Sequence, residues 1–167
     1  MIRIGIIIIT IEINGGSMNY KVTSKSETDT TEFAQNIESE KFPGMVICLN
    51  GELGSGKTVF VKGFAQALGI EDNITSPTFN IVKEYAIGEL PLYHMDVYRL
   101  QEVRETIGFN DYFNQNGVCI IEWADMIANY LPKERLDITF IIVDENTRIL
   151  VFSPKGKKYE DLCEAVL

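Results

Sequence analysis

Short apolar runs alternate with helix-like patterns along most of the chain. Met45–Asn50 is a continuous apolar run of strand length, which is typical of a strand buried on both faces. Residues 58–68 then place apolar side chains at helical intervals and stop before Gly69, a residue that commonly follows a helix. A glycine-rich segment lies between the two. This order of strand, glycine loop and helix predicts an α/β domain.

Further elements are expected on both sides of this unit. Residues 26–37 open with capping hydroxyls and acids and predict a helix. Two antiparallel strand pairs are predicted, 80–85 with 92–98 and 136–143 with 148–152, because turn residues separate each pair. The pattern also predicts short helices in 101–113, a strand over 118–121, a helix ending at 130 and a last helix over 159–167. We expect one domain with a mixed parallel and antiparallel central sheet.

The first residues have a composition of their own. Residues 2–13 are strongly apolar, but the stretch is too short to span a bilayer and lacks a cleavage site typical of a signal peptide. It can form a strand. Because Gly15 and Gly16 shortly precede Met18, and Gly-Gly codons can encode a purine-rich ribosome site, we hypothesise that translation begins at Met18. Residues 1–17 are then an N-terminal extension and 18–167 the domain, and a native peptide containing residues 6–9 would contradict this.

Charge and cysteine content restrict the function. The 167 residues carry a formal charge of -9, which repels nucleic-acid backbones and disfavours tight, unaided binding to them. The three cysteines are odd in number, and two of them sit in apolar runs, as expected of free thiols in a reducing cytoplasm. There is one histidine and no pair of cysteines two residues apart, which excludes a structural zinc site. We expect a cytoplasmic protein.

One motif carries the chemistry. The segment Gly51–Thr58, GELGSGKT, matches the phosphate-binding pattern G-x-x-x-x-G-K-[ST] and lies between a predicted strand and helix, as that pattern requires. Its glycines let successive main-chain N–H groups point at phosphate oxygens. Lys57 adds a charge on the outer phosphates, and the Thr58 hydroxyl is expected to bind Mg²⁺. The sequence therefore predicts a three-layer P-loop NTPase fold that binds ATP and Mg²⁺. The expected nucleotide contacts are Gly51, Leu53, Gly54, Ser55, Gly56, Lys57, Thr58 and Val59.

Hydrolysis or phosphoryl transfer also needs acids beside the metal. Glu122 directly follows an apolar strand, and Asp96 lies within the predicted strand LYHMDVYRL. We predict that Glu122 is the acid on the metal side and Asp96 the catalytic acid, or that these two roles are exchanged. Either acid can bind the metal, directly or through water, and both act with Lys57 in catalysis. From the residues alone, His94 and Trp123 are interpreted as structural. The hydroxyl-rich segment 75–78 is interpreted as a turn, and a role in sensing the terminal phosphate stays open.

The pattern as a whole resembles the TsaE family of bacterial ATPases. The blocks that carry the resemblance are GELGSGKT, TSPTFNIVKEY, LPLYHMDVYRL, IGFNDYF, GVCIIEWAD and the pair Leu131–Pro132, all in the family's order. The resemblance runs from about residue 20 to the end of the chain. It implies an ATPase of the pathway that makes threonylcarbamoyladenosine (t6A) in tRNA. The implied partners are the threonylcarbamoyl transferase and its inactive paralogue (TsaD and TsaB type proteins), with tRNA contacted only through them.

The resemblance also implies roles for single residues. Ser76 and Thr78 fall in a switch-like loop beside the phosphates, and Trp123 lies near the nucleotide or that loop. Glu122 is implied to bind Mg²⁺, and Asp96, in the block that begins at His94, is implied to be the functional acid. Thr28 matches a family position near the adenine.

Other classes of P-loop protein are weighed against this interpretation. A GTPase needs an Asn/Thr-Lys-x-Asp box and an Asp-x-x-Gly switch, and the sequence contains neither. A small-molecule kinase stays open, although the sequence has no Arg-rich insertion of the kind that forms a lid over an acceptor. A nucleotide-gated binding module, in which turnover is incidental, also stays open.

Overall fold

An eight-stranded mixed sheet forms the centre of the molecule. The computed structural model describes residues 10–77, 80–100 and 108–167. The strand order is β1-β2-β8-β7-β3-β6-β5-β4. The strands are β1 Thr10–Asn14, β2 Ser17–Ser24, β3 Val46–Gly51, β4 Val82–Tyr85, β5 Leu92–Asp96, β6 Val118–Glu122, β7 Arg135–Ile142 and β8 Arg148–Lys155. The helices are α1 Glu27–Ser39, α2 Lys57–Ala67, α3 Phe109–Phe113, the 3₁₀ segment η2 Ala124–Tyr130 and α4 Lys157–Val166.

Parallel pairing is confined to the middle of the sheet. Strand β3 runs parallel to both β6 and β7, and β5 runs parallel to β6. The pairs β4–β5 and β7–β8 are antiparallel, which confirms the two predicted hairpins. The pairs β1–β2 and β2–β8 are antiparallel as well. The predicted mixed sheet is confirmed.

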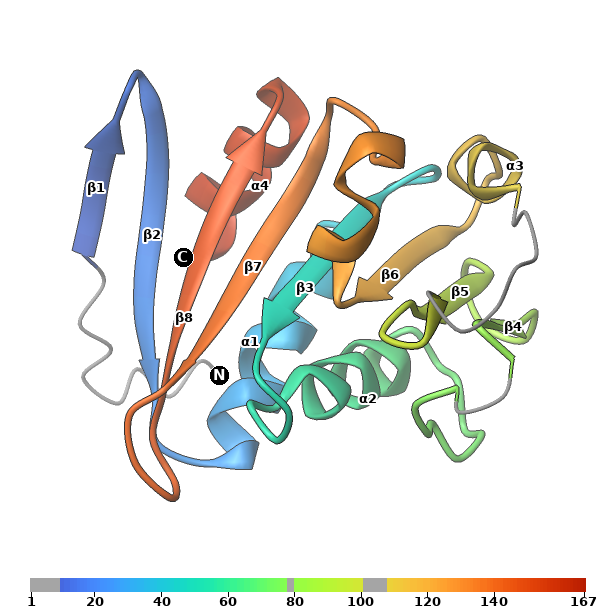
Figure 1. Cartoon of the computed structure of the whole chain (residues 1–167), viewed down its shortest axis with the longest axis horizontal. Coiled ribbons are helices and arrows are strands. Elements are labelled where there is room, and N and C mark those ends of the chain that lie inside the picture. The colour runs from blue at the N-terminus through green and yellow to red at the C-terminus, as the bar shows by residue number, and fades with distance from the viewer. Residues whose placement is uncertain (1–9, 78–79, 101–107) are drawn as a thin grey trace.

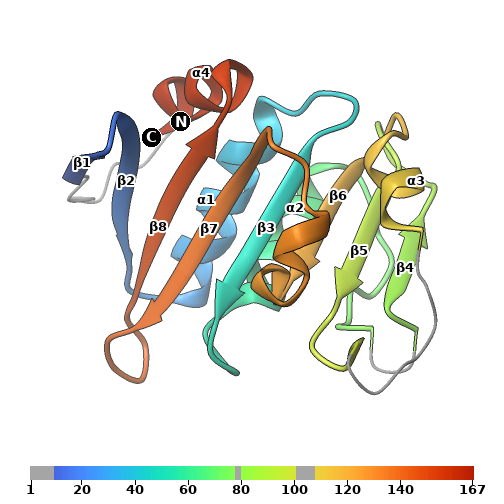
Figure 2. The ribbon, with the colours of Figure 1, turned by 45° about the horizontal axis from the view of Figure 1, so that its top comes forward.

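Helices cover the sheet on both faces and produce three layers. Helices α1, α2 and α4 lie behind the sheet, and η2 and α3 lie in front of its right half (Figures 1 and 2). Strand β3 is buried between them: Ile47 and Leu49 belong to the larger core cluster with α1 and α2, whereas Val46 and Cys48 belong to the cluster with α3 and η2. Burial on both faces explains why this strand reads as one continuous apolar run.

The register of β5 and β6 places three polar side chains on one face. Asp96 is paired with Glu122, and His94 with Ile120. Because side chains alternate along a strand, His94, Asp96 and Glu122 share the face on which Ile120 packs in the core cluster with α2. Asp96 and Glu122 end their strands at the same edge, and His94 lies one pleat deeper.

Two helices begin at this edge by different means. The Ser26 hydroxyl caps α1 by accepting a hydrogen bond from the Asp29 N–H at 3.1 Å, as the capping pattern predicts. Beneath it, the buried hydroxyls of Ser24 and Thr30 are hydrogen-bonded at 2.8 Å. Helix α2 starts instead after Gly56, where no side chain of the described residues caps it.

Some expectations differ from the structure. The helix predicted to end at Tyr130 is a 3₁₀ segment with a kink at Ile127 (φ -121°, ψ 28°). Of the short helices expected in 101–113, α3 covers 109–113, and residues 101–107 lie outside the described residues. Of the apolar N-terminal stretch, residues 10–13 belong to strand β1, which pairs with β2. Within the described ranges, no helix is long and apolar enough to cross a membrane.

Candidate nucleotide-binding site

The glycine-rich loop joins β3 to α2 in a conformation that only glycine adopts freely. Gly54 and Gly56 have φ angles of +76° and +103°, in the left-handed region. Because Gly56 ends the loop and no described side chain caps α2, the first N–H groups of that helix face the cavity side without a side-chain acceptor. The N-terminus of a helix in this state binds anions such as phosphate.

Gly51 lies close to β7 and to its own loop. It does not line the cavity described below. A Cβ atom at this position would lie 2.7 Å from the main-chain oxygen of Phe140 in β7 and 2.8 Å from the Ser55 hydroxyl. A side chain here would push the start of the loop away from the sheet.

The Lys57 side chain folds back over its own loop. Its Nζ donates to the main-chain oxygens of Gly51 and Glu52 at 2.6 Å and 2.9 Å and stands 4.0 Å from the centroid of the Trp123 ring. Burial lowers the pKa of Lys57 below its ordinary value, against the opposing effect of the carboxylates Glu122 and Asp96. Phosphate oxygens would compete with these carbonyl groups for the ammonium.

Trp123 has an unusual backbone conformation. Its φ of +61° is the only positive φ of a non-glycine residue in the described part of the chain. Its N–H donates to the Leu49 oxygen at 2.9 Å, and its ring packs on Tyr98 with the centroids 4.6 Å apart. The turn after β6 thereby positions the indole over Lys57.

The two acids at the sheet edge are engaged by different hydroxyls. The Thr58 hydroxyl contacts both carboxylate oxygens of Glu122, at 3.1 Å and 3.2 Å. The Ser76 hydroxyl donates to Asp96 Oδ2, and Asp96 Oδ1 accepts from the Tyr98 N–H at 3.0 Å. His94, which is fully buried, lies behind Glu122 with its Nε2 2.8 Å from Oε1.

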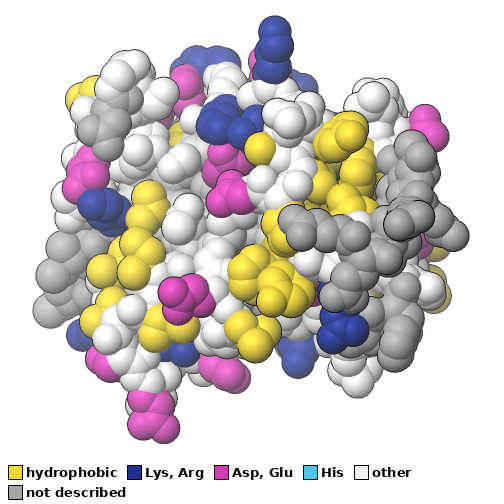
Figure 3. All heavy atoms as spheres, in the orientation of Figure 1, with side chains coloured by type: hydrophobic (Ala, Val, Ile, Leu, Met, Phe, Trp, Pro, Cys, Tyr) yellow, Lys and Arg dark blue, Asp and Glu magenta, His cyan; other side chains and the backbone are white. Residues whose placement is uncertain are grey.

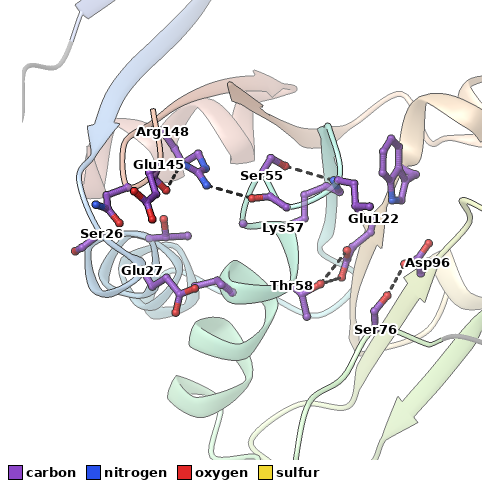
Figure 4. A pocket seen from close by; sticks show the side chains of 17 residues that line it. Ser26, Glu27, Ser55, Lys57, Thr58, Ser76, Asp96, Glu122, Glu145 and Arg148 are labelled. Atoms are coloured by element: carbon purple, nitrogen blue, oxygen red, sulfur yellow. Dashed lines mark hydrogen bonds between the residues drawn. The ribbon is translucent and has the colours of Figure 1, made fainter. Parts of the chain in front are cut away.

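These groups surround a cavity of about 440 Å³, a size usual for small-molecule sites. Figure 4 shows that Ser26, Glu27, Glu145 and Arg148 lie on one side of the loop, and Thr58, Glu122, Asp96 and Ser76 on the other. The cavity is lined by Ser26, Glu27, Thr30, Leu53, Gly54, Ser55, Gly56, Lys57, Thr58, Val59, Ser76, Asp96, Glu122, Trp123, Glu145, Asn146 and Arg148.

The oxygen ligands beside Thr58 fit a magnesium ion. A hydroxyl and two carboxylates are hard oxygen donors, and Mg²⁺ in nucleotide sites uses one or two carboxylates together with phosphate oxygens and water. The described residues contain no group of three or more His, Cys, Asp and Glu side chains that could hold a metal by themselves. Thr58, Glu122 and Asp96 are side chains that could hold Mg²⁺ together with a nucleotide.

Comparisons with known proteins show which family the chain belongs to. The sequence model described as "Threonylcarbamoyl adenosine biosynthesis protein TsaE" matches residues 24–150, a span that includes every residue that lines the cavity. The chain belongs to the TsaE family. The TsaE protein of Bacillus subtilis (strain 168) is 51% identical over 122 residues, which cover 73% of this chain and 77% of that protein. The TsaE protein of Treponema pallidum (strain Nichols) is 40% identical over 134 residues, 78% of this chain and 98% of that protein.

The fold is also that of the TsaE family. The crystal structure of YdiB from Bacillus subtilis superposes with a TM-score of 0.79 at 38% identity, and the match covers 94% of this chain and 95% of that one. The resemblance to the TsaE family and the P-loop α/β fold expected from the sequence are both confirmed.

Most of the residues predicted for the site of this TsaE-family chain line the cavity. The exceptions are Gly51, which packs against β7, and Thr28, which is exposed while its neighbours Ser26 and Glu27 line the cavity. Thr78 lies outside the described residues. The structure thus brings together segments that are distant in the sequence: the P-loop, the ends of β5 and β6, and the start of α1.

The sequence did not predict that the β7–β8 turn forms a wall of the cavity. Arg148 Nη2 donates to the Gly54 oxygen at 3.2 Å, and Nη1 donates to the Asp144 and Thr147 oxygens at 2.7 Å and 3.0 Å. Glu145 lines the same wall. The only signal in the sequence is the predicted hairpin turn, which does not reveal what it packs against. The turn lies beside the P-loop because β7 pairs with β3, the strand that leads into the loop.

Proposed function

We propose that this protein binds ATP with Mg²⁺ in the cavity and hydrolyses it as an accessory to t6A modification of tRNA. The observation that carries the proposal is the contact between Thr58 at the start of α2 and Glu122 at the end of β6, beside the P-loop. A hydroxyl and a carboxylate at these places form the expected metal side of a phosphate site. The pathway is proposed because the similar proteins are named for t6A biosynthesis.

The charge of the cavity supports magnesium as an obligatory companion of the nucleotide. Among the described lining residues, Glu27, Asp96, Glu122 and Glu145 are acidic, and only Lys57 and Arg148 are basic. A polyphosphate would be repelled by such an excess of carboxylates in a partly desolvated site. Mg²⁺ supplies the missing positive charge, so ATP affinity should depend on it.

Each residue has a distinct role in the proposal. Main-chain N–H groups of residues 54–58 bind the phosphates, and Lys57 turns from its loop carbonyls to the outer phosphates. Thr58 and Glu122 hold the metal. Asp96 orients the attacking water or shares the metal, and Ser76 holds Asp96 until the nucleotide arrives. When bound, Mg²⁺ neutralises charge on the phosphates.

The partners we propose are the transferase and its inactive paralogue, with tRNA contacted through them, in the cytoplasm. The net charge of -9 disfavours direct binding to tRNA. Hydrophobic side chains gather at the centre and on the left of the face shown in Figure 3, and Leu53, Tyr98 and Ile141 are among the exposed large hydrophobic residues. Exposed apolar groups of this kind suit a protein partner.

Calorimetry tests the binding step. ATP should bind the wild-type chain in Mg²⁺, and Lys57→Ala should raise the Kd about 10-fold or more, because a charge on the outer phosphates is lost. Lys62→Ala, on the exposed side of the same helix, is the matched control and should leave the Kd within about 2-fold. Wild-type affinity in the Lys57 variant would contradict the assignment of the loop.

Phosphate release tests the reaction. Release from ATP is measured with the chain alone, with the purified partner pair, and with candidate acceptor molecules. Faster release in the presence of the partner pair supports the proposal. Release that requires an acceptor hydroxyl indicates a kinase instead, and binding without release even in the complex indicates a nucleotide-gated module.

A further inference from the structure

His94 is the one histidine of the chain, and it lies where a histidine is costly. Its side chain is fully buried on the α2 side of the sheet. Within the described ranges, its Nδ1 has no hydrogen-bond partner. A buried polar atom without a partner lowers stability, so an apolar residue would serve the core better at this position. The second ring nitrogen, Nε2, does have a partner.

That nitrogen touches the acid of the proposed metal site. Nε2 lies 2.8 Å from Glu122 Oε1, and the Glu122 side chain is only 4% exposed. An ionised carboxylate accepts hydrogen bonds and donates none. When the Glu122 carboxylate is ionised, this contact requires the proton on Nε2, so that His94 donates to Glu122.

The second contact of Glu122 is one that a nucleotide complex removes. The Thr58 hydroxyl contacts both carboxylate oxygens, but the same hydroxyl is needed as a ligand of Mg²⁺. Once Thr58 turns to the metal, the hydrogen bond from His94 is the only one left on this carboxylate from a described side chain. Partners that orient a metal-binding carboxylate tune metal affinity.

We propose that His94 is a positioning residue that holds the Glu122 carboxylate toward the magnesium site. The inference rests on the proposed function, because it presupposes that Glu122 meets Mg²⁺ there. His94 does not touch the nucleotide or the metal itself. It acts on the metal-dependent part of ATP binding and leaves the metal-independent part unchanged.

The first test separates these two parts by calorimetry. The Kd for ATP is measured in Mg²⁺ and in EDTA, and the ratio of the two gives the enhancement by magnesium. His94→Leu should reduce this enhancement about 10- to 100-fold with the Kd in EDTA unchanged. His94→Gln, whose amide N–H reaches a similar point, should restore most of it. Met95→Ala alters the adjacent buried residue on the other face of β5 and should keep the wild-type enhancement.

The outcomes distinguish this inference from the proposed function. If the wild-type chain binds no ATP, or binds it equally in EDTA, the proposed function fails. If magnesium enhances wild-type binding and the folded His94→Leu variant shows the same enhancement, the positioning role is wrong. An equal loss in Met95→Ala would also overturn it, because the effect would then reflect general loosening of β5.

The second test needs no variant and therefore no assumption about folding. With one histidine in the chain, ¹⁵N-histidine labelling gives a single imidazole whose two nitrogens are assigned by NMR. We expect a proton on Nε2, and a change in that signal when Mg²⁺–ATP is compared with ATP in EDTA. A proton on Nδ1 with a bare Nε2 would overturn the proposal.

Discussion

Among the described residues, Lys57 and Arg148 are the two basic ones that line the cavity, and main-chain oxygens accept hydrogen bonds from both. Lys57 donates to carbonyl groups of its own loop, and Arg148 joins the β7–β8 turn to the Gly54 oxygen of the same loop. The motif made Lys57 predictable, because its neighbours define its position. Arg148 was not predictable, since its importance comes from a contact between residues 94 positions apart.

Arg148 provides a test at this scale. Arg148→Ala should raise the Kd for ATP about 5- to 20-fold, because a charged donor and the wall it holds are lost, while the free energy of unfolding should change by less than about 1 kcal/mol. Arg135→Ala is the matched control. It begins β7 at the opposite end of the hairpin, where Arg135 pairs with Asp137 at 2.8 Å. Calorimetry measures the Kd for ATP, and urea denaturation measures the free energy of unfolding. Equal ATP affinity of the Arg148→Ala and Arg135→Ala variants would contradict the role of the β7–β8 turn as a wall of the site.

At the scale of elements, the packing of α1 against α2 sets the width of the cavity. Helix α1 carries Ser26, Glu27 and Thr30 at its start, and α2 carries Thr58. The helices meet at Gly63, where a Cβ atom would lie 2.9 Å from the Thr31 Cα and 3.1 Å from the Ala34 Cβ. Such contacts with backbone cannot be relieved by a rotamer change, so the helices would have to move apart.

Gly63→Ala should therefore destabilise the fold and weaken the site together. We expect a loss of about 1–3 kcal/mol from overpacking, although alanine is the better helix former by about 1 kcal/mol. The ATP affinity should fall with it. The exposed neighbour Lys62→Ala should change stability by less than about 0.5 kcal/mol. Thermal unfolding and calorimetry provide the comparison, and a stabilised Gly63→Ala chain would show that the helices tolerate the methyl group.

The local pattern of apolar and turn residues predicted most helices and strands. The features that it did not predict have physical causes. β3, β6 and the two hairpins were predictable because burial and turn residues leave periodic signals. The helix predicted to end at Tyr130 is present, but its 3₁₀ form and the kink at Ile127 were not predicted, since they arise in a segment that follows the left-handed Trp123 and contacts β3. Tertiary contacts of this kind leave no periodic trace.

At the scale of the whole molecule, the order of strands decides which residues meet. The site unites β3, β5 and β6 with the β7–β8 turn, and chain order does not give these neighbours. The P-loop was predicted from its motif, Glu122 from its place directly after an apolar run, and Asp96 from its place in a predicted strand. The family resemblance implies a place for Thr28 near the adenine, and in the structure Thr28 is exposed while Ser26 and Glu27 line the cavity. Which side chains at the start of α1 face the cavity depends on how the helix packs, and the sequence pattern does not give this.

The buried core also makes a prediction about pH. Burial raises the pKa of Cys119, Cys163 and Tyr159 to about 12 each, above their ordinary values of 9.0 for cysteine and 10.0 for tyrosine. The unfolded chain therefore releases these protons first, and the folded chain keeps them. The stability that this contributes is complete below about pH 9 and is lost as the pH rises toward about 12.

Urea denaturation between about pH 8 and pH 11 measures this loss. Each group that is protonated only in the folded state lowers the free energy of unfolding by about 1.4 kcal/mol per pH unit, so the two thiols alone should remove about 3 kcal/mol between pH 10 and pH 11. Cys163→Ala should make the dependence of the unfolding free energy on pH shallower by about 1.4 kcal/mol per pH unit. The same slope in the variant and the wild-type chain would mean that Cys163 titrates alike in the folded and unfolded states, contrary to its full burial against the sheet.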